Sequence, residues 1–113
     1  MNVYAVTKSR ISDSQYEWWA DEHNVFVGVY ASVTKAIDTV MDLTSKEAIY
    51  WINPEWSDAE YERYFSDKSY SRTLTIVTYE KPDYPYWHIC TAKYESELFG
   101  NMTEHYYVQR IEI

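Results

Sequence analysis

The most informative stretch of this chain reads Asn24-Val-Phe-Val-Gly-Val-Tyr-Ala-Ser-Val-Thr-Lys-Ala-Ile-Asp-Thr-Val-Met41. In residues 24–31 the valines at positions 25, 27 and 29 alternate with Phe26, Gly28 and Tyr30, which predicts a strand with the valines on one face. Gly28, on the aromatic face, predicts a bulge or the close approach of a neighbouring ring. The residues that follow predict that this strand passes directly into a helix.

The helix signal begins at Ser32, whose hydroxyl can accept a hydrogen bond from the free amides of a first helical turn. From there the apolar residues recur at helical spacing and form a single stripe, and the helix is expected to end near Leu43. The stripe consists of Val33, Ala36, Ile37, Val40 and Met41.

Two later segments have the form of a capping box, in which a Ser or Thr and a Glu three residues on satisfy free helix amides. After Thr44-Ser-Lys-Glu47, residues 48–52 are open to two interpretations: their β-branched and aromatic side chains favour a strand, and the capping box favours a separate helical turn before Asn53-Pro54, which is the preferred prediction. Ser57-Asp-Ala-Glu60 predicts a short second helix over residues 58–65.

Strand patterns occupy the two ends of the chain. Residues 81–85 are rich in proline and separate two alternating segments, so these two segments predict a long antiparallel hairpin. Residues 95–104 are expected to form a loop before a closing strand with one solvated face. The predicted strands are residues 2–8, 24–31, 72–80, 86–94 and 105–113.

These elements predict an α+β fold in the order strand-strand-helix-helix-strand-strand-strand. The mainly antiparallel five-stranded sheet would carry the helices on one face, within a single domain, 1–113. The lone cysteine, Cys90, excludes an internal disulfide and favours a reducing compartment. The N-terminus has no secretory signal, and no apolar run approaches the roughly 20 residues of a membrane span, so a cytoplasmic protein is expected.

The composition is acidic and aromatic. Eighteen acids against ten bases give a net charge of −8, which disfavours direct binding to nucleic acid or to membranes and favours a basic protein partner. Thirteen Tyr, five Trp and three Phe are more large rings than a core of this size is expected to enclose. Some aromatic rings should therefore lie at the surface, where they are typical of interfaces.

Three stretches carry a resemblance: Tyr4-Ala-Val6, then Val27-Gly-Val-Tyr-Ala-Ser32 with Lys35-Ala36, and Tyr107-Val-Gln-Arg-Ile-Glu-Ile113. They resemble a class of small uncharacterised phage and bacterial proteins and, loosely, small acidic phage-encoded anti-defence inhibitors such as anti-CRISPR proteins. The resemblance implies a sheet with helices on one side and a mobile-element origin, and it brings no catalytic residues. The acidic, Trp-rich segment before Asn24 and the hairpin of residues 72–94 depart from the pattern.

The chain offers few residues for catalysis. His88 and Cys90 are two residues apart on a predicted strand, so both should lie on one face. A structural zinc site needs four ligands, and a packed cysteine beside a hydrogen-bonded histidine is the favoured interpretation. Cys90 as a nucleophile has no Gly-rich turn or evident oxyanion donor. No cofactor, metal site or catalytic residue is predicted.

Acids interleaved with aromatics are the main functional signal, and they suggest a small acidic inhibitor rather than an enzyme. It would bind the basic nucleic-acid-binding surface of a host defence nuclease, as an anti-CRISPR or anti-restriction protein that mimics DNA. The alternatives are a solvated face over the core, a protein–protein module or homodimer, and a small-ligand binder or enzyme that uses His88 and Cys90. The predicted partner-binding residues are Asp13, Glu17, Trp18, Trp19, Asp21, Glu22, Glu55, Trp56, Asp58, Glu60, Glu62 and Asp67.

Overall fold

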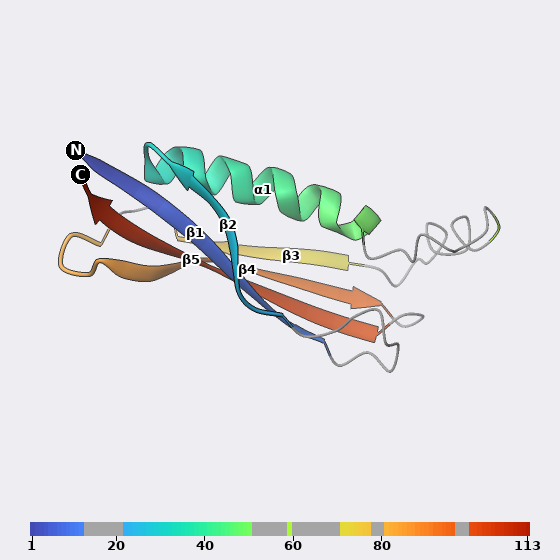
Figure 1. The fold of residues 1–113 in the computed structure, drawn as a ribbon. Coiled ribbons are helices and arrows are strands. Elements are labelled where there is room, and N and C mark those ends of the chain that lie inside the picture. Colours follow the sequence, from blue (N-terminus) through green and yellow to red (C-terminus); the bar gives the residue numbers. More distant parts are fainter. Residues whose placement is uncertain (13–21, 51–58, 60–70, 78–80, 97–99) are drawn as a thin grey trace.

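The computed structural model confirms an α+β fold with a five-stranded antiparallel sheet and a helix (Figure 1). It describes residues 1–12, 22–50, 59, 71–77, 81–96 and 100–113. The predicted second helix, residues 58–65, lies outside these ranges apart from Ala59. The elements in chain order are β1 (Asn2–Ser12), β2 (Glu22–Tyr30), α1 (Val33–Tyr50), β3 (Ser71–Ile76), β4 (Tyr86–Ser96) and β5 (Gly100–Glu112).

The strands lie in the order β2-β1-β5-β4-β3, so the two ends of the chain form the interior of the sheet. β1 and β5 pair without interruption from Asn2 opposite Glu112 to Ser12 opposite Met102. The termini lie side by side, and the Ile113 amide donates to the Met1 carbonyl at 2.8 Å (Figure 1). β5 is the middle strand, and β2 and β3 are the edges.

The hairpin of β3 and β4 was predicted and is confirmed, but the loop predicted for residues 95–104 was wrong. β4 continues to Ser96, β5 starts at Gly100, and the two pair along this length. The physical reason is that every second residue from Met102 to Val108 is buried, as a strand requires. Met102 and Glu104 continue the pattern of Tyr106 and Val108, and all four side chains lie on the buried face.

Helix α1 starts as predicted. The Lys35 amide donates to Ser32 Oγ at 3.1 Å, and the Ala36 amide donates to the Ser32 carbonyl at 3.1 Å. The helix does not end near Leu43 but continues to Tyr50, so the capping box at Thr44 and the separate turn after it were wrong. The hydroxyls of Thr44 and Ser45 instead donate back to the carbonyls of Met41 and Asp42, which a continuing helix accommodates.

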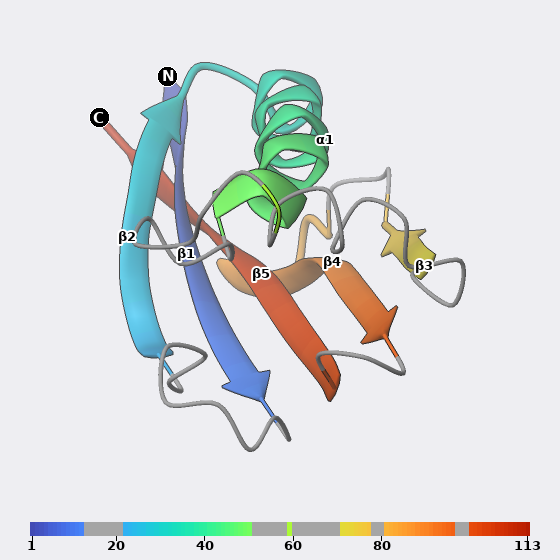
Figure 2. The same ribbon diagram turned by 90° about the vertical axis from the view of Figure 1, so that its right-hand side faces the viewer.

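Helix α1 covers one face of the sheet, here called the inner face (Figure 2). Four residues of the predicted stripe are buried against it: Val33, Ala36, Ile37 and Val40. Met41 is instead 45% exposed, while Thr44 is fully buried. The reason is helical geometry, because Thr44 follows Val33 by about three full turns and so lies in the middle of the stripe, whereas Met41 lies at its margin.

A bulge in β2 corrects the predicted faces of that strand. Val6 pairs with Gly28 but Thr7 pairs with Phe26, so Val27 is the extra residue. The valines therefore do not share a face: Val27 packs against the core, and Val29 points away from it. Both expectations for Gly28 are confirmed. The bulge lies next to it, at Val27, and the Tyr30 ring approaches closely, since a Cβ at position 28 would lie 2.6 Å from the Tyr30 hydroxyl.

Candidate functional site

The face of the sheet opposite α1, here called the outer face, is not covered by any other described helix or strand (Figure 2). Paired residues in neighbouring strands point to the same side, so the register assigns its members. They are the odd-numbered residues of β1 from Val3 to Ile11, of β3 from Ser71 to Thr75 and of β5 from Asn101 to Ile111, with Phe26 and Val29 of β2 and Tyr86, His88, Thr91, Lys93 and Glu95 of β4.

The outer face is almost free of charge. In a chain of which 25% is charged, only Lys93 and Glu95 among these described side chains carry a full charge, and their signs are opposite. The remaining members are hydroxyl, amide, imidazole, aromatic or aliphatic. Depletion of charge together with aromatic residues is the composition of a protein interface core.

Large apolar side chains on the outer face are exposed. Phe26 is 65% exposed, and Ile11, Val29, Tyr86 and Ile111 each expose more than a third of their surface. These residues come from four different strands, so the exposed apolar surface spans the sheet and is not confined to one edge. A neutral face with this many exposed apolar groups is a candidate binding surface.

A cluster of rings lies near the middle of the outer face, where β4 and β5 run side by side. The rings of Tyr86 and Tyr107 stack at 5.5 Å between centroids, and those of His88 and His105 lie 5.6 Å apart. Thr91 joins the two imidazoles: its Oγ1 lies 2.7 Å from His88 Nε2 and 3.2 Å from His105 Nδ1. One hydroxyl can donate to one neutral imidazole and accept from the other, so this geometry suits two neutral histidines.

The electrostatics favour the neutral form of His88. Burial lowers the pKa of His88, and the charges of His105 and Lys81 lower it further. A hydrogen bond to the Cys90 backbone raises the pKa but does not cancel these effects. The described cations near the pair, Lys81 and Lys93, disfavour an additional positive charge. The lowered pKa of His88 means that its surroundings disfavour the protonated imidazole.

His88 and Cys90 do not share a face, which corrects the prediction. His88 pairs with Tyr107 but Cys90 pairs with Tyr106, so Ile89 forms a bulge between them. His88 consequently lies on the outer face and Cys90 is buried on the inner face. Burial, with a smaller contribution from Glu104, raises the pKa of the Cys90 thiol to about 11, so it is not a thiolate near neutral pH. No group of three or more metal-ligating side chains occurs within the described ranges.

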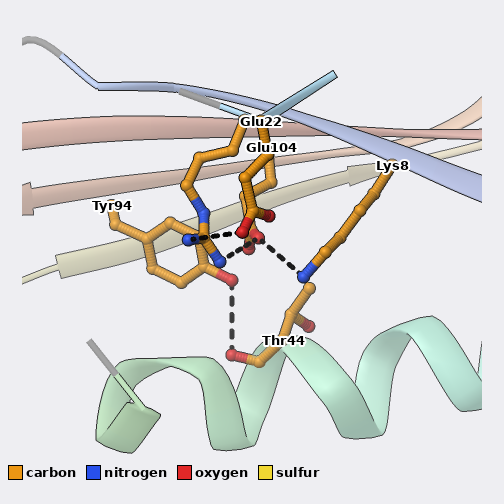
Figure 3. Close-up of polar contacts among 6 residues, drawn as sticks. Lys8, Glu22, Thr44, Tyr94 and Glu104 are labelled. Carbon is orange, nitrogen blue, oxygen red and sulfur yellow. Dashed lines mark hydrogen bonds and ion pairs between the residues drawn. The ribbon is translucent and has the colours of Figure 1, made fainter. Parts of the chain in front are cut away.

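The inner face carries its own polar cluster, in which Glu104 is fully buried (Figure 3). A Glu104 carboxylate oxygen lies 3.4 Å from an Arg10 guanidinium nitrogen and 3.8 Å from Lys8 Nζ. Arg10 also pairs with Glu22 at 3.7 Å, which links edge strand β2 to the cluster. Beside it the Tyr94 hydroxyl donates to the Thr44 carbonyl of α1 at 3.4 Å. The sequence-based prediction missed this cluster because it placed Glu104 in a loop.

The predicted partner-binding residues fall almost entirely outside the described ranges, and only Glu22 is within them. Its carboxylate is engaged with Arg10 inside the molecule. The charge divides in the same way: the described ranges contain eight acids and eight bases, and the remaining segments contain ten acids and two bases. The predicted residues outside the described ranges are Asp13, Glu17, Trp18, Trp19, Asp21, Glu55, Trp56, Asp58, Glu60, Glu62 and Asp67.

No family model, curated protein or solved structure matches the chain. The resemblance to small phage and bacterial proteins therefore stays a prediction. No helix within the described ranges is long and apolar enough to cross a membrane. The features of the chain that bear on function are the chemistry of the outer face and the distribution of charge.

Proposed function

We propose that this chain is a protein-binding module, rather than an enzyme, and that it recognises its partner with the outer face of the sheet. The observation that carries the proposal is the combination of exposure and neutrality: Phe26, Val29 and Ile11 are exposed on a face with only one charge of each sign. Covering a half-exposed aliphatic or aromatic side chain gains about 1 kcal/mol, so several together favour association.

The same face is poorly suited to nucleic acid. Stacking platforms for single strands combine aromatic rings with a groove of basic residues that follows the phosphates. Here the rings of Tyr86 and Tyr107 are present, but Lys93 is the sole described cation among the outer-face residues and Glu95 opposes it. A protein surface is the class of partner that the chemistry favours.

The test is a comparison of two matched double variants as baits. Phe26→Glu with Val29→Glu places two acids on the outer face, and Thr34→Glu with Met41→Glu places two acids on exposed positions of α1. Quantitative mass spectrometry should identify a protein that both the wild-type bait and the bait changed on α1 retain. The bait changed on the outer face should retain at least about tenfold less of this protein, which is equivalent to a loss of about 1.4 kcal/mol in binding free energy. Equal retention by all three baits would contradict the proposal.

A second candidate is the acidic inhibitor of a basic, nucleic-acid-binding protein such as a defence nuclease, and the segregation of charge favours it. The described scaffold is balanced, so the net charge of −8 comes from sequence segments that also contain most of the tryptophans. Concentrated acids with large rings can compete for a surface that binds nucleic acid.

This second candidate is tested by band-shift competition against a nuclease. Reversing Asp13, Glu17 and Asp21 to lysine should weaken inhibition and reduce its salt dependence. The matched control reverses three described acids, Asp38, Asp42 and Asp83, which changes the net charge equally. If both triple variants inhibit alike, total charge rather than the acidic segment is responsible, and this candidate fails.

A further inference from the structure

We propose that the partner of the outer face is a second copy of this chain, packed face to face across a two-fold axis near His105 and Tyr107, and that acid separates the two copies. This inference rests on the proposed binding function of the outer face. It adds the identity of the partner and a form of regulation.

The hydrogen-bonding groups of the outer face are complementary to themselves. Hydroxyl, amide and neutral imidazole groups each donate and accept, whereas Lys and Arg only donate and ionised Asp and Glu only accept. Near a two-fold axis a residue meets its own copy, so only groups of the first kind can pair there. The middle of the outer face has this chemistry in Thr91, His105 and Tyr107.

Charge also favours a second copy. Two chains that each carry a net charge of −8 repel one another, so a stable contact between them requires a surface without net charge. The outer face meets this condition, because Lys93 and Glu95 cancel. A partner of a different, basic kind would instead be matched by acids, which this face lacks apart from Glu95.

The area of the face fits a dimer. Five strands at about 4.8 Å spacing and a length of about 36 Å for the eleven residues of β1 give roughly 700–850 Å², allowing for the shorter edge strands. A standard interface buries about 800 Å² on each partner. Two such sheets can pack as an aligned sandwich, with the apolar side chains of one face between those of the other.

The two-fold axis brings the histidines together. β5 is the middle strand of the sheet, and His105 and Tyr107 lie near the middle of β5. The neighbouring outer-face positions on β1 and β3, Ser9 and Thr75, are uncharged. In a face-to-face dimer four imidazoles would therefore lie close to the axis.

Acid would separate this assembly because no acidic side chain within the described ranges lies beside the two imidazoles to stabilise their charged form. The described charges that face the pair are Lys81 and Lys93, both positive, while Glu95 lies two outer-face positions beyond Thr91, about 13 Å along the strand. Protonation would place up to four like charges in a desolvated centre. The lowered pKa of His88 agrees with this, because it shows that the surroundings of His88 disfavour its positive charge.

The first experiment is sedimentation velocity on the full chain over a wide range of concentration, at about pH 7.5 and at about pH 5, on either side of an ordinary histidine pKa. A dimer at the higher pH and at least tenfold weaker association at the lower pH are expected. The variant His88→Gln with His105→Gln should dimerise equally at both. A wild type that is monomeric at every concentration overturns the second copy as partner. A wild-type dimer whose association does not change with pH overturns the separation by acid.

The second experiment locates the contact by cross-linking with a short bis-maleimide. Thr7→Cys, which lies beside Tyr107 on the outer face, should give covalent dimers, and the matched variant Thr34→Cys on α1 should not. Native Cys90 is buried and should remain unmodified. Equal cross-linking of both variants, or of neither, overturns the outer-face dimer.

The two proposals fail in distinguishable ways. Tyr107→Lys should give a folded monomer by circular dichroism, and Tyr107→Phe should remain dimeric. If the wild type is monomeric but the bait with Phe26→Glu and Val29→Glu still loses a partner, the second copy is wrong and the binding face stands. If the wild type is dimeric and folded Tyr107→Lys remains dimeric, the second copy does not bind the outer face, and the bait comparison alone decides whether that face binds another protein.

Discussion

The two faces of this sheet reverse the ordinary distribution of charge. The inner face, covered by α1, buries the carboxylate of Glu104 with the cations of Lys8 and Arg10. The outer face exposes Phe26 and Val29, and its described residues carry only one charge of each sign. Most proteins place charged groups outside and apolar groups inside.

The two faces stabilise their unusual groups in different ways. Buried charge is tolerated on the inner face because each carboxylate has cations within ion-pair distance, and removal of one partner leaves the rest uncompensated. On the outer face the apolar groups gain nothing until another surface covers them. The charges of the inner face are therefore paired within the chain, whereas the apolar side chains of the outer face would be covered only by the partner proposed above.

The largest effect should come from breaking the inner face at Glu104. Glu104→Gln removes the buried negative charge that compensates Lys8 and Arg10, so the free energy of unfolding should fall by about 3–5 kcal/mol. Urea denaturation followed by circular dichroism measures it. The matched control is Glu95→Gln on the outer face, where an exposed carboxylate should change stability by less than about 0.5 kcal/mol. Similar losses from both variants would contradict the contrast between the faces.

A smaller loss is expected at the β2 bulge, on the inner side of the edge strand. In Gly28→Ala the added Cβ would lie 2.6 Å from the Tyr30 hydroxyl, so the ring must shift, at a cost of about 1–2 kcal/mol. Removing the hydroxyl in Tyr30→Phe should recover part of the loss. Denaturation of the two single variants and the double variant measures this coupling, and strict additivity would show that the close approach is not responsible.

The fold was predictable where local chemistry and tertiary packing agree. Ser32 has the hydroxyl that a helix start requires, and the apolar stripe after it is buried except for Met41. Predictions went wrong where a local signal had two meanings. The hydroxyl of Thr44 can cap a new helix or bond back into an existing one, and the burial of its side chain on the sheet-facing side of α1 selects the second.

The candidate site was less predictable because shifts of register change the faces. Alternation assigns faces only while the pairing register is constant, and it shifts at Val27, again between Val25 and Glu22, and at Ile89. Gly28 signalled the first bulge. No comparable residue stands beside Ile89, so alternation predicted His88 and Cys90 on the same face. The outer face follows from the register of all five strands, which is a tertiary property.

The hydroxyl of Ser32, which caps the start of α1, should contribute to the stability of the fold. Ser32→Ala removes the acceptor for the Lys35 amide and should lower the free energy of unfolding by about 1 kcal/mol. Ser32→Gly should lower it by only a few tenths of a kcal/mol, because glycine is a tolerated cap. Thermal melts of both variants provide the measurement. Equal losses would mean that the Ser32 hydroxyl does not act as a cap.

The smallest effect concerns the outer face of a single chain and its response to pH. The folded structure lowers the pKa of His88, so it disfavours the protonated form relative to the unfolded chain. Stability is then greatest above the ordinary histidine pKa of about 6.5 and decreases as the pH falls through it towards the lowered folded value. Urea denaturation between about pH 8 and pH 5, at concentrations where the chain is monomeric, should show this decrease in the wild type. His88→Gln should reduce the decrease, and Tyr107→Phe, which keeps both histidines and the ring, should preserve it. A steeper loss of stability in His88→Gln than in the wild type would show that the outer face favours the charged imidazole, which would reverse the sign on which the acid response depends.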